Sequence, residues 1–353
     1  MKRRLLSFAC LLVIAVAGAF VMRQPSRPQA EKRSEITLQK QTVRLIGVAA
    51  MFIGFSAVAQ TLQGIVSANG LQIAYIERGT LTAVPILFIQ GVGSPISDGP
   101  DPIADQLVAA GFRWITFDNR DSGGSTHFDA AGMPDYEAIQ NAAAQGLPLP
   151  LAYTLSDMAD DAIGVLDALN IDRAHVVGGS LGGVIAQVIA AKHPDRVLSL
   201  TLISTTTGNP ALAYGSAFDS LMLPVPEERE ARIAQDMAFE RQLIGPLQDI
   251  DEVLLRQTVE SRLDRDDDPA ATARQGITVS GDLRPLIAGI AAPTEVVHGQ
   301  VDLLFPPEHG REVADSIPGA VLTIVPDMGH VVTDALAPII VDAVLRAVAR
   351  VDE

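Results

Sequence analysis

The sequence has 353 residues, 48% hydrophobic and 19% charged, enough apolar material for one large domain or a core with an inserted lobe. Its formal net charge is −16; residues 1–59 carry nine Lys and Arg against two Glu, which leaves −23 on the remainder. Residues 60–353 are acidic enough to repel phosphate backbones, which argues against a nucleic-acid partner. The single cysteine, Cys10, excludes an intramolecular disulfide and a thiolate metal cluster.

Two apolar segments, each preceded by basic residues, occupy the N-terminal region 1–59. Residues 1–20 and 41–60 both have the design of a signal peptide. If both spanned a membrane, the linker 23–44 with its six Lys and Arg would lie outside, which the positive-inside rule disfavours. We therefore expect the second segment to be an export signal, with Met22 as a candidate start. The alternatives are an uncleaved membrane anchor, and a cytoplasmic protein if neither segment works as a signal.

From about residue 64 the pattern alternates between strands and helices, which is typical of a mostly parallel sheet covered on both faces. Residues 64–78 predict an opening hairpin with a turn at Asn69-Gly70. Further strands are expected at 84–91, 112–126 (running into a polar turn), 173–177, 196–205, 293–299 and 320–327, and helices over 154–171, 181–193 and 335–351. Residues 142–151 are expected to form a loop insertion.

The alternation breaks at 206–285, where no strong strand pattern occurs. Helices are expected over 226–245 and 249–264, followed by a charged connector at 264–270. This stretch reads as a helical cap that interrupts one α/β domain. The core would then consist of 60–205 and 286–353.

The stretch "HVVGGSLGGVIAQ" (175–187) places Ser180 between an expected strand and an expected helix. In that context Gly178-x-Ser180-x-Gly182 predicts a nucleophile elbow, a sharp turn that presents the serine hydroxyl. The turn strains the backbone, and side chains at Gly178 and Gly182 would collide there. The alternative is a glycine-rich bend with an idle serine.

A serine nucleophile needs a general base and an acid that orients it. His330 follows the last expected strand, where a loop can bring it over Ser180, and His127 is a minor alternative. Asp302 follows the penultimate strand at its carboxyl end. Asp327 is interpreted as shaping a turn. The remaining histidines are interpreted as structural: His175, His193, His298 and His309.

Backbone N–H groups are expected to bind the oxyanion. One should come from Leu181, directly after the serine, and the other from Val92, between Gly91 and Gly93. Apolar cap residues could line a substrate pocket, although packing against the core explains them equally well. They are Phe218, Leu221, Met222 and Leu223.

Five motifs together make the chain resemble the α/β-hydrolase superfamily: "FIQGVG", "FDNRDSGGST", "HVVGGSLGG", "HGQVD" and "PDMGH". The second, together with "DMADDAIGVLDALNIDRAHVVGGSLGG" (157–183), resembles the serine esterase branch that includes aclacinomycin methylesterase-type enzymes. The resemblance implies a sheet of about eight strands with helices on both faces, a helical cap, and the order Ser180, Asp302, His330. It also implies a mechanism through an acyl-enzyme, with no metal and no cofactor.

Two positions depart from the commoner pattern of the superfamily. Gln90 stands where many relatives carry histidine, and Asp121 stands where glycine is usual, although the esterase branch shares this form. Arg120, Asp121 and Ser125 are interpreted as stabilising the turn.

The leading hypothesis is a serine esterase acting on a small-molecule carboxylic ester. Other enzymes of the fold remain alternatives: a proline-iminopeptidase-like, lactonase-like or haloperoxidase-like activity. A non-catalytic binding protein on the same scaffold is an alternative of another class. A serine at 180 argues against dehalogenases and epoxide hydrolases of this fold, whose nucleophile is aspartate.

Overall fold

The computed structural model describes residues 60–96, 101–221, 223–246, 248–265 and 268–352. The expected export or anchor region at 1–59 and the candidate pocket residue Met222 lie outside these ranges. Within the described ranges, no helix combines the length and apolar character needed to cross a bilayer.

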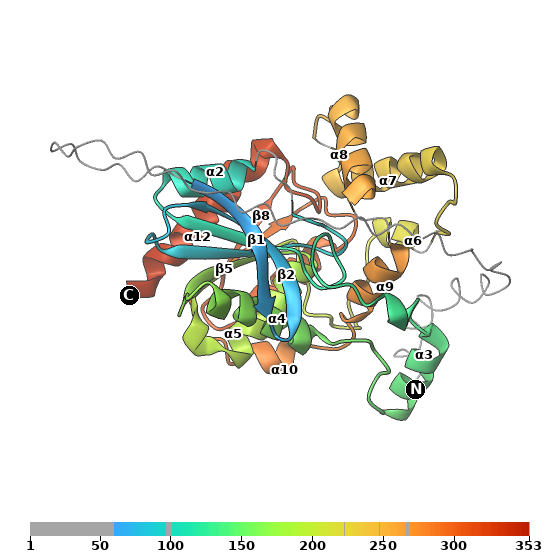
Figure 1. The fold of residues 1–353 in the computed structure, drawn as a ribbon, viewed down its shortest axis with the longest axis horizontal. Helices are drawn as coiled ribbons and strands as arrows, with labels where there is room; N and C mark the ends of the chain where they lie inside the picture. The colour runs from blue at the N-terminus through green and yellow to red at the C-terminus, as the bar shows by residue number, and fades with distance from the viewer. Residues whose placement is uncertain (1–59, 97–100, 222, 247, 266–267, 353) are drawn as a thin grey trace, which may run out of the picture.

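Eight strands form one sheet in the order β1-β2-β4-β3-β5-β6-β7-β8 (Figure 1). β2 pairs antiparallel with β1 and β4, and all other neighbours are parallel. The mostly parallel sheet predicted from the sequence is thus confirmed. The strands are β1 (Gln60–Ala68), β2 (Leu71–Gly79), β3 (Pro85–Ile89), β4 (Arg113–Phe117), β5 (Ala174–Gly179), β6 (Val197–Ile203), β7 (Thr294–Gly299) and β8 (Val321–Val325).

The predicted turn between β1 and β2 is also present. Asn69 and Gly70 have φ angles of 48° and 78°. Two successive residues with positive φ are typical of the two-residue turn whose twist suits a hairpin. The α-helices are α2 (Pro102–Ala109), α3 (Tyr136–Gln145), α4 (Leu155–Ala168), α5 (Leu181–Lys192), α6 (Ala217–Leu221), α7 (Arg229–Ile244), α8 (Glu252–Arg265), α9 (Pro269–Ile277), α10 (Arg284–Ile287), α11 (Pro307–Ser316) and α12 (Ala337–Ala349).

Side chains of the central strands alternate between two cores, one on each face of the sheet. In β3, Leu87 and Ile89 enter the core under α4, α5, α10 and α11, whereas Ile86 enters the core under α2 and α12. Figure 1 shows α2 and α12 on one side of the sheet and α4, α5 and α10 on the other. The sheet is therefore a buried middle layer, and its strand ends are what remains accessible for chemistry.

The helices without a counterpart among those expected from the sequence include α2, α3, α6, α9 and α10. The loop expected at 142–151 is wrong for residues 142–145, which belong to α3. Asp135 caps the start of that helix, Gly146 ends it with φ 67°, and alanines, the best helix formers, fill its last turns. Within the expected connector 264–270, residues 264 and 265 still belong to α8, and Pro269 already begins α9.

Helices α6 to α9 lie between β6 and β7 in the chain and group together beside the sheet (Figure 1). We call them the cap. α7 and α8 pack on each other through a small apolar cluster of their own: Ile233, Met237, Leu255, Val259 and Leu263. α9 differs, because it carries two buried polar residues, Arg274 and Gln275, that bond to loops of the core.

A buried ion pair joins α9 to the turn after β4. Asp121 adopts a left-handed backbone with φ 64°, and its carboxylate accepts hydrogen bonds from Arg274 Nε at 2.7 Å and Nη2 at 2.8 Å. The Tyr153 hydroxyl donates to the same carboxylate at 2.7 Å and the Phe128 amide at 2.6 Å. Burial works to raise the pKa of Asp121, but these donors outweigh it and hold the pKa below the ordinary 3.8.

We expect Asp121→Asn to lower the free energy of unfolding by about 3 kcal/mol at neutral pH, because it leaves the buried Arg274 charge with only the longer, partly exposed contact to Asp268 at 3.3 Å. Asparagine tolerates the left-handed backbone, so the change isolates the charge. A carboxylate with a lowered pKa contributes stability above the ordinary 3.8 and loses it as the pH falls through the folded-state value. The difference between variant and wild type should therefore shrink below pH 3.8 in denaturant titrations.

Asp264→Asn is the matched control, because Asp264 pairs with Arg229 in the cap but is 68% exposed. Exposed pairs of this kind contribute about 0–1 kcal/mol. Equal losses in the two variants, or a difference that grows as the pH falls, would contradict the assignment.

Candidate active site

Ser180 lies on the sharp turn between β5 and α5, with φ 52° and ψ −121°. This strained backbone is held in place by β6, because the Ser180 amide donates to the Ile203 carbonyl at 3.0 Å and the Thr205 hydroxyl donates to the Ser180 carbonyl at 2.8 Å. Strain of this kind persists only where surrounding contacts enforce it.

The neighbouring glycines make the turn sterically possible. A Cβ on Gly178 would meet the backbone of Gly182, and a Cβ on Gly182 would collide with the Ile89 carbonyl of β3. Both obstacles are backbone atoms and cannot swing aside. The structure thus supplies the steric reason for glycine on each side of the serine that the sequence motif suggested.

Two loops at the carboxyl ends of β7 and β8 bring Asp302 and His330 to Ser180. His330 Nε2 lies 3.0 Å from Ser180 Oγ, and His330 Nδ1 lies 2.9 Å from Asp302 Oδ2. A carboxylate only accepts hydrogen bonds, so the ring proton sits on Nδ1 and Nε2 is left to accept from the serine hydroxyl. The three residues predicted from the sequence are in hydrogen-bonding contact.

The cap also holds the His330 loop. The amides of His330 and Val331 donate to the Leu243 carbonyl in the last turn of α7, at 2.6 and 3.1 Å. Carbonyls in the last turn of a helix lack intrahelical partners, so this one is free to accept. The position of the candidate base therefore depends partly on the cap.

The Asp302 carboxylate is buried and fully engaged. Its Oδ1 accepts from the amides of Leu304 and Phe305 at 2.8 and 2.9 Å, while its Oδ2 faces His330. Burial works to raise the pKa of Asp302, but the neighbouring His330 and the backbone donors hold the pKa below its ordinary value. The carboxylate can thus stay ionised and stabilise a positive charge on His330.

His298, interpreted from the sequence as structural, lies beside this carboxylate. Its Nε2 donates to the Phe305 carbonyl at 2.8 Å and is 3.5 Å from Asp302 Oδ2. Burial lowers the pKa of His298, so the ring is neutral. Its position four residues before Asp302 was visible in the sequence, but the pattern did not say on which side of the strand the ring lies.

The other histidines bond elsewhere, and among the described residues only His330 bonds to Ser180. His127, the minor alternative for the base, contacts the Gly123 carbonyl at 3.2 Å. The remaining ones are bonded as follows: His175 to Ser199, His193 to Asp160, and His309 to Thr206.

Residues 90–96, which we call the β3 loop, pass directly beside Ser180. A Cβ built on Gly91 would lie 3.6 Å from the Ser180 Cβ. Among the described residues, the next amide, that of Val92, has no hydrogen-bond partner. Leu181 begins α5, where the first amides of a helix point outward without an intrahelical acceptor. Both expected oxyanion donors are thus on backbone segments next to the serine.

The turn after β4 anchors both ends of the β3 loop. Asn119 Nδ2 donates to the Gln90 carbonyl at 3.0 Å, and the Ile96 amide donates to Asp118 Oδ1 at 2.6 Å. The side chain of Gln90 donates to the Thr116 hydroxyl at 3.3 Å, a bond within the sheet that does not involve the site. Arg120 and Ser125 also stabilise this region, through Asp161 and the Asp118 carbonyl.

Aromatic side chains form a wall next to the candidate base. Phe305 meets His330 edge-on with ring centres 5.2 Å apart, and Tyr214 stacks on Phe218 at 4.3 Å and contacts Phe305. Phe218 therefore belongs to a cluster that reaches the site. Leu221 and Leu223 instead are 42% and 53% exposed, and neither belongs to a buried cluster of the described chain.

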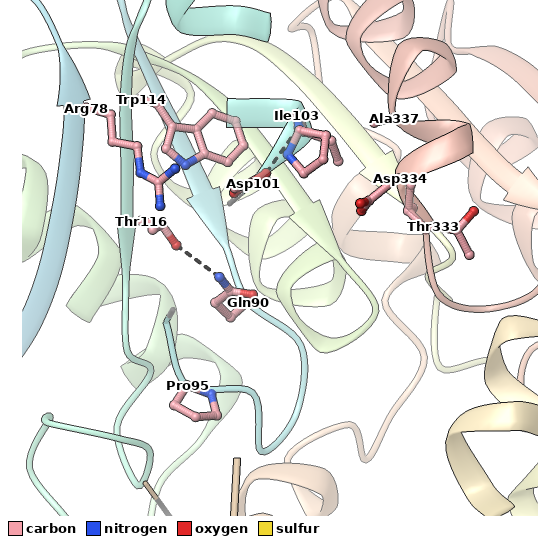
Figure 2. A pocket seen from close by; sticks show the side chains of 12 residues that line it. Arg78, Gln90, Pro95, Asp101, Ile103, Trp114, Thr116, Thr333, Asp334 and Ala337 are labelled. Carbon is pink, nitrogen blue, oxygen red and sulfur yellow. Dashed lines mark hydrogen bonds between the residues drawn. The ribbon is translucent and has the colours of Figure 1, made fainter. Parts of the chain in front are cut away.

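A cavity of about 250 Å³ borders Gln90 and Pro95 of the β3 loop and the N-terminal ends of α2 and α12. Figure 2 shows its polar lining, with Gln90 reaching Thr116 and Asp101 reaching the first turn of α2. None of Ser180, Asp302 and His330 lines it. Among the described residues, one group has the spacing of metal ligands, His127, Asp129 and Asp268, and it shares no member with the three.

We expect Gly182→Ala to destabilise the protein by about 1–3 kcal/mol, because the added methyl group must displace the backbone of β3. Gly179→Ala is the matched control in the same turn, since a Cβ there would meet nothing within 4 Å. Denaturant titration measures both. Equal stability of the two variants would contradict the steric argument.

Comparisons with known proteins agree with this architecture. A family model described as "alpha/beta hydrolase fold" matches residues 84–334. Rhodomycin D methylesterase DauP of Streptomyces sp. (strain C5) is 29% identical over 284 residues, which cover 70% of this chain and 84% of the relative. The 2-hydroxymuconate semialdehyde hydrolase of Pseudomonas sp. (strain CF600) is 29% identical over 186 residues, covering 52% and 64%.

Among solved structures, the enol-lactonase from Burkholderia xenovorans LB400 superposes with a TM-score of 0.61 at 23% identity. The match covers 81% of this chain and 100% of the lactonase chain. At this identity the likeness shows the fold alone.

Proposed function

The chain belongs to the alpha/beta hydrolase fold family, and from that premise we propose that it hydrolyses carboxylic esters through an acyl-enzyme on Ser180. It is an enzyme of the hydrolase class. The observation that carries the proposal is the continuous hydrogen-bonded series from Ser180 Oγ through His330 to Asp302, at 3.0 and 2.9 Å. A serine hydroxyl becomes a good nucleophile only when such a base removes its proton.

In the first half of the reaction, Ser180 Oγ attacks the ester carbonyl carbon while its proton moves to His330 Nε2. The carbonyl electron pair moves onto oxygen, and the amides of Val92 and Leu181 stabilise that oxyanion. The ionised Asp302 stabilises the imidazolium that forms. When the tetrahedral intermediate collapses, the bond to the alkoxy group breaks and His330 gives it the proton. An alcohol leaves and the acyl group stays on Ser180.

In the second half, a water molecule gives a proton to His330 Nε2 while its oxygen attacks the acyl carbon. The same amides hold the second oxyanion. Collapse breaks the bond to Ser180 Oγ, which regains its proton from His330, and the carboxylic acid leaves. Each turnover consumes one ester and one water molecule, and the enzyme returns to its starting state.

The proposed substrate is a small-molecule ester with an apolar part. The relative named as a methylesterase supports ester chemistry, and the aromatic side chains of Tyr214, Phe218 and Phe305 provide an apolar surface near the base. A panel of esters, lactones and aminoacyl arylamides separates the esterase from a lactonase or an iminopeptidase of the same fold.

We expect Ser180→Ala and His330→Ala each to lower kcat for p-nitrophenyl acetate by about 10⁴- to 10⁶-fold. Serine, histidine and aspartate act as one catalytic unit, so loss of the serine or the histidine alone costs about as much as loss of all three. His127→Ala is the matched control and should stay within about threefold of wild type, since His127 bonds to Gly123 and not to Ser180. Equal turnover by wild type and Ser180→Ala would reject the mechanism.

A fluorophosphonate probe should label wild type on Ser180 and leave Ser180→Ala unlabelled. This readout needs no knowledge of the substrate. An unlabelled wild type would instead favour a non-catalytic binding protein on this scaffold.

Export remains a proposal that rests on residues 1–59, outside the described residues. Mass-spectrometric mapping of the mature N-terminus tests it. A chain that starts near residue 60 is the expected product, and one that retains residues 22–59 would rule out cleavage after the second apolar segment.

A further inference from the structure

We propose that Gln275, on cap helix α9, is a positioning residue that sets the Val92 amide in the oxyanion hole, so that a seated cap is a condition for fast catalysis. The proposal rests on the esterase function proposed above. It assigns to the cap a role in the rate of the reaction, in addition to shaping the space for the substrate.

The side chain of Gln275 bridges two backbone segments of the core. It is fully buried. Its Oε1 accepts from the Gly93 amide at 2.8 Å, and its Nε2 donates to the Arg120 carbonyl at 2.7 Å. In the reverse orientation, the side-chain NH₂ would face the Gly93 N–H and the side-chain oxygen would face the Arg120 carbonyl. The two partners therefore determine the orientation of the amide. A carboxamide offers an acceptor to the Gly93 amide and a donor to the Arg120 carbonyl at the same time.

The bond to Gly93 acts on the residue next to the candidate oxyanion donor. Gly93 has φ 57°, and a Cβ built there would lie 2.9 Å from the Thr272 hydroxyl of α9, so the helix packs directly on the loop at this point. Gln275 accepts from the Gly93 N–H, whereas the neighbouring Val92 N–H has no hydrogen-bond partner among the described residues. A fixed Gly93 peptide in turn limits how far the Val92 amide can rotate away from Ser180.

Among the described residues, the hydrogen bonds from the core to the β3 loop lie at its two ends, through Asn119 at Gln90 and Asp118 at Ile96, while the Val92 side chain packs against the apolar core. In the middle of the loop, the hydrogen bond that fixes the backbone comes from α9, through Gln275 to the Gly93 amide. Arg265 at the end of α8 adds a second contact from the cap, to the Ile96 carbonyl. Loss of Gln275 should therefore loosen the middle of the loop and leave its ends in place.

Gln275 is not the only residue that docks α9 on the core. The adjacent Arg274 pairs with Asp121 and donates to the Gly132 carbonyl at 2.8 Å. These bonds keep the helix on the core when Gln275 is changed. A substitution at 275 can thus separate the positioning of the loop from the docking of the cap.

The decisive comparison is Gln275→Met with Gln242→Met, assayed on p-nitrophenyl acetate in the full-length protein. Methionine keeps the length of glutamine and removes both hydrogen bonds. The expected result for Gln275→Met is a kcat about 10- to 100-fold below wild type with KM within about threefold, because oxyanion donors act on the transition state. Gln242 bonds to Ser220 within the cap, so its variant should keep wild-type kcat.

Two further variants define the chemistry. Gln275→Glu keeps the acceptor for Gly93 but turns an oxygen toward the Arg120 carbonyl, and should also lose kcat. Gln275→Asn keeps both functions on a shorter chain and should recover part of it. A kcat within twofold of wild type for folded Gln275→Met, or a loss confined to KM, overturns the proposal.

Amide hydrogen exchange of the wild-type protein gives a test that does not require any variant to fold. The Gly93 amide should exchange slowly and the Val92 amide quickly. Fast exchange at Gly93 overturns the proposal even if the esterase function stands. A wild type that turns over no ester and resists the fluorophosphonate overturns the proposed function itself, and with it this role for Gln275.

Discussion

The site depends on close backbone contact between β3, β5 and α5 at the turn after β5. Gly182 of α5 lies against the Ile89 carbonyl of β3, and Gly178 lies against Gly182. Ser180 keeps its strained conformation, with φ 52° and ψ −121°, within this close packing. The same packing also places the end of β3, and therefore the loop that follows, beside the serine. The nucleophile and both expected oxyanion donors thus derive their positions from one steric contact.

Around that contact, the remaining groups arrive on loops that long-range polar contacts hold in place. Asp302 is fixed by two backbone amides, and His330 by the Leu243 carbonyl at the end of α7. The turn after β4 bonds to the β3 loop on one side and to Arg274 on the other. The cap is consequently bonded to the core at the candidate base, at the β3 loop and at Asp121. Loss of any of these bonds should lower the free energy of unfolding, because it would leave a buried polar group without a partner.

The sequence was informative where the signal was local. Apolar strands, the glycines around Ser180, and residues placed just after strand ends are each visible within about ten residues of chain, and the three site residues expected from them lie in contact. Gln275 was not found, because its partner Gly93 is 182 residues away and a buried glutamine looks like any surface polar residue in a helix. α9 itself was obscured by the charged stretch before Pro269, which suggested a connector. That His298 of β7 lies beside Asp302 also depends on tertiary structure, which the spacing of the two residues in the sequence did not show.

The polar contacts of α9 bear on how such enzymes could be recombined. A cap is an attractive unit for exchange between relatives, since it leaves and re-enters the core between two neighbouring strands, β6 and β7. In this chain, however, Arg274 and Gln275 are matched to Asp121 and to the backbone at Gly93 and Arg120. A chimaera that received a foreign cap would need those partners as well. If the exchanged segment ended after α8, α9 would stay with the core and keep these bonds. A segment that ended after α9 would break them.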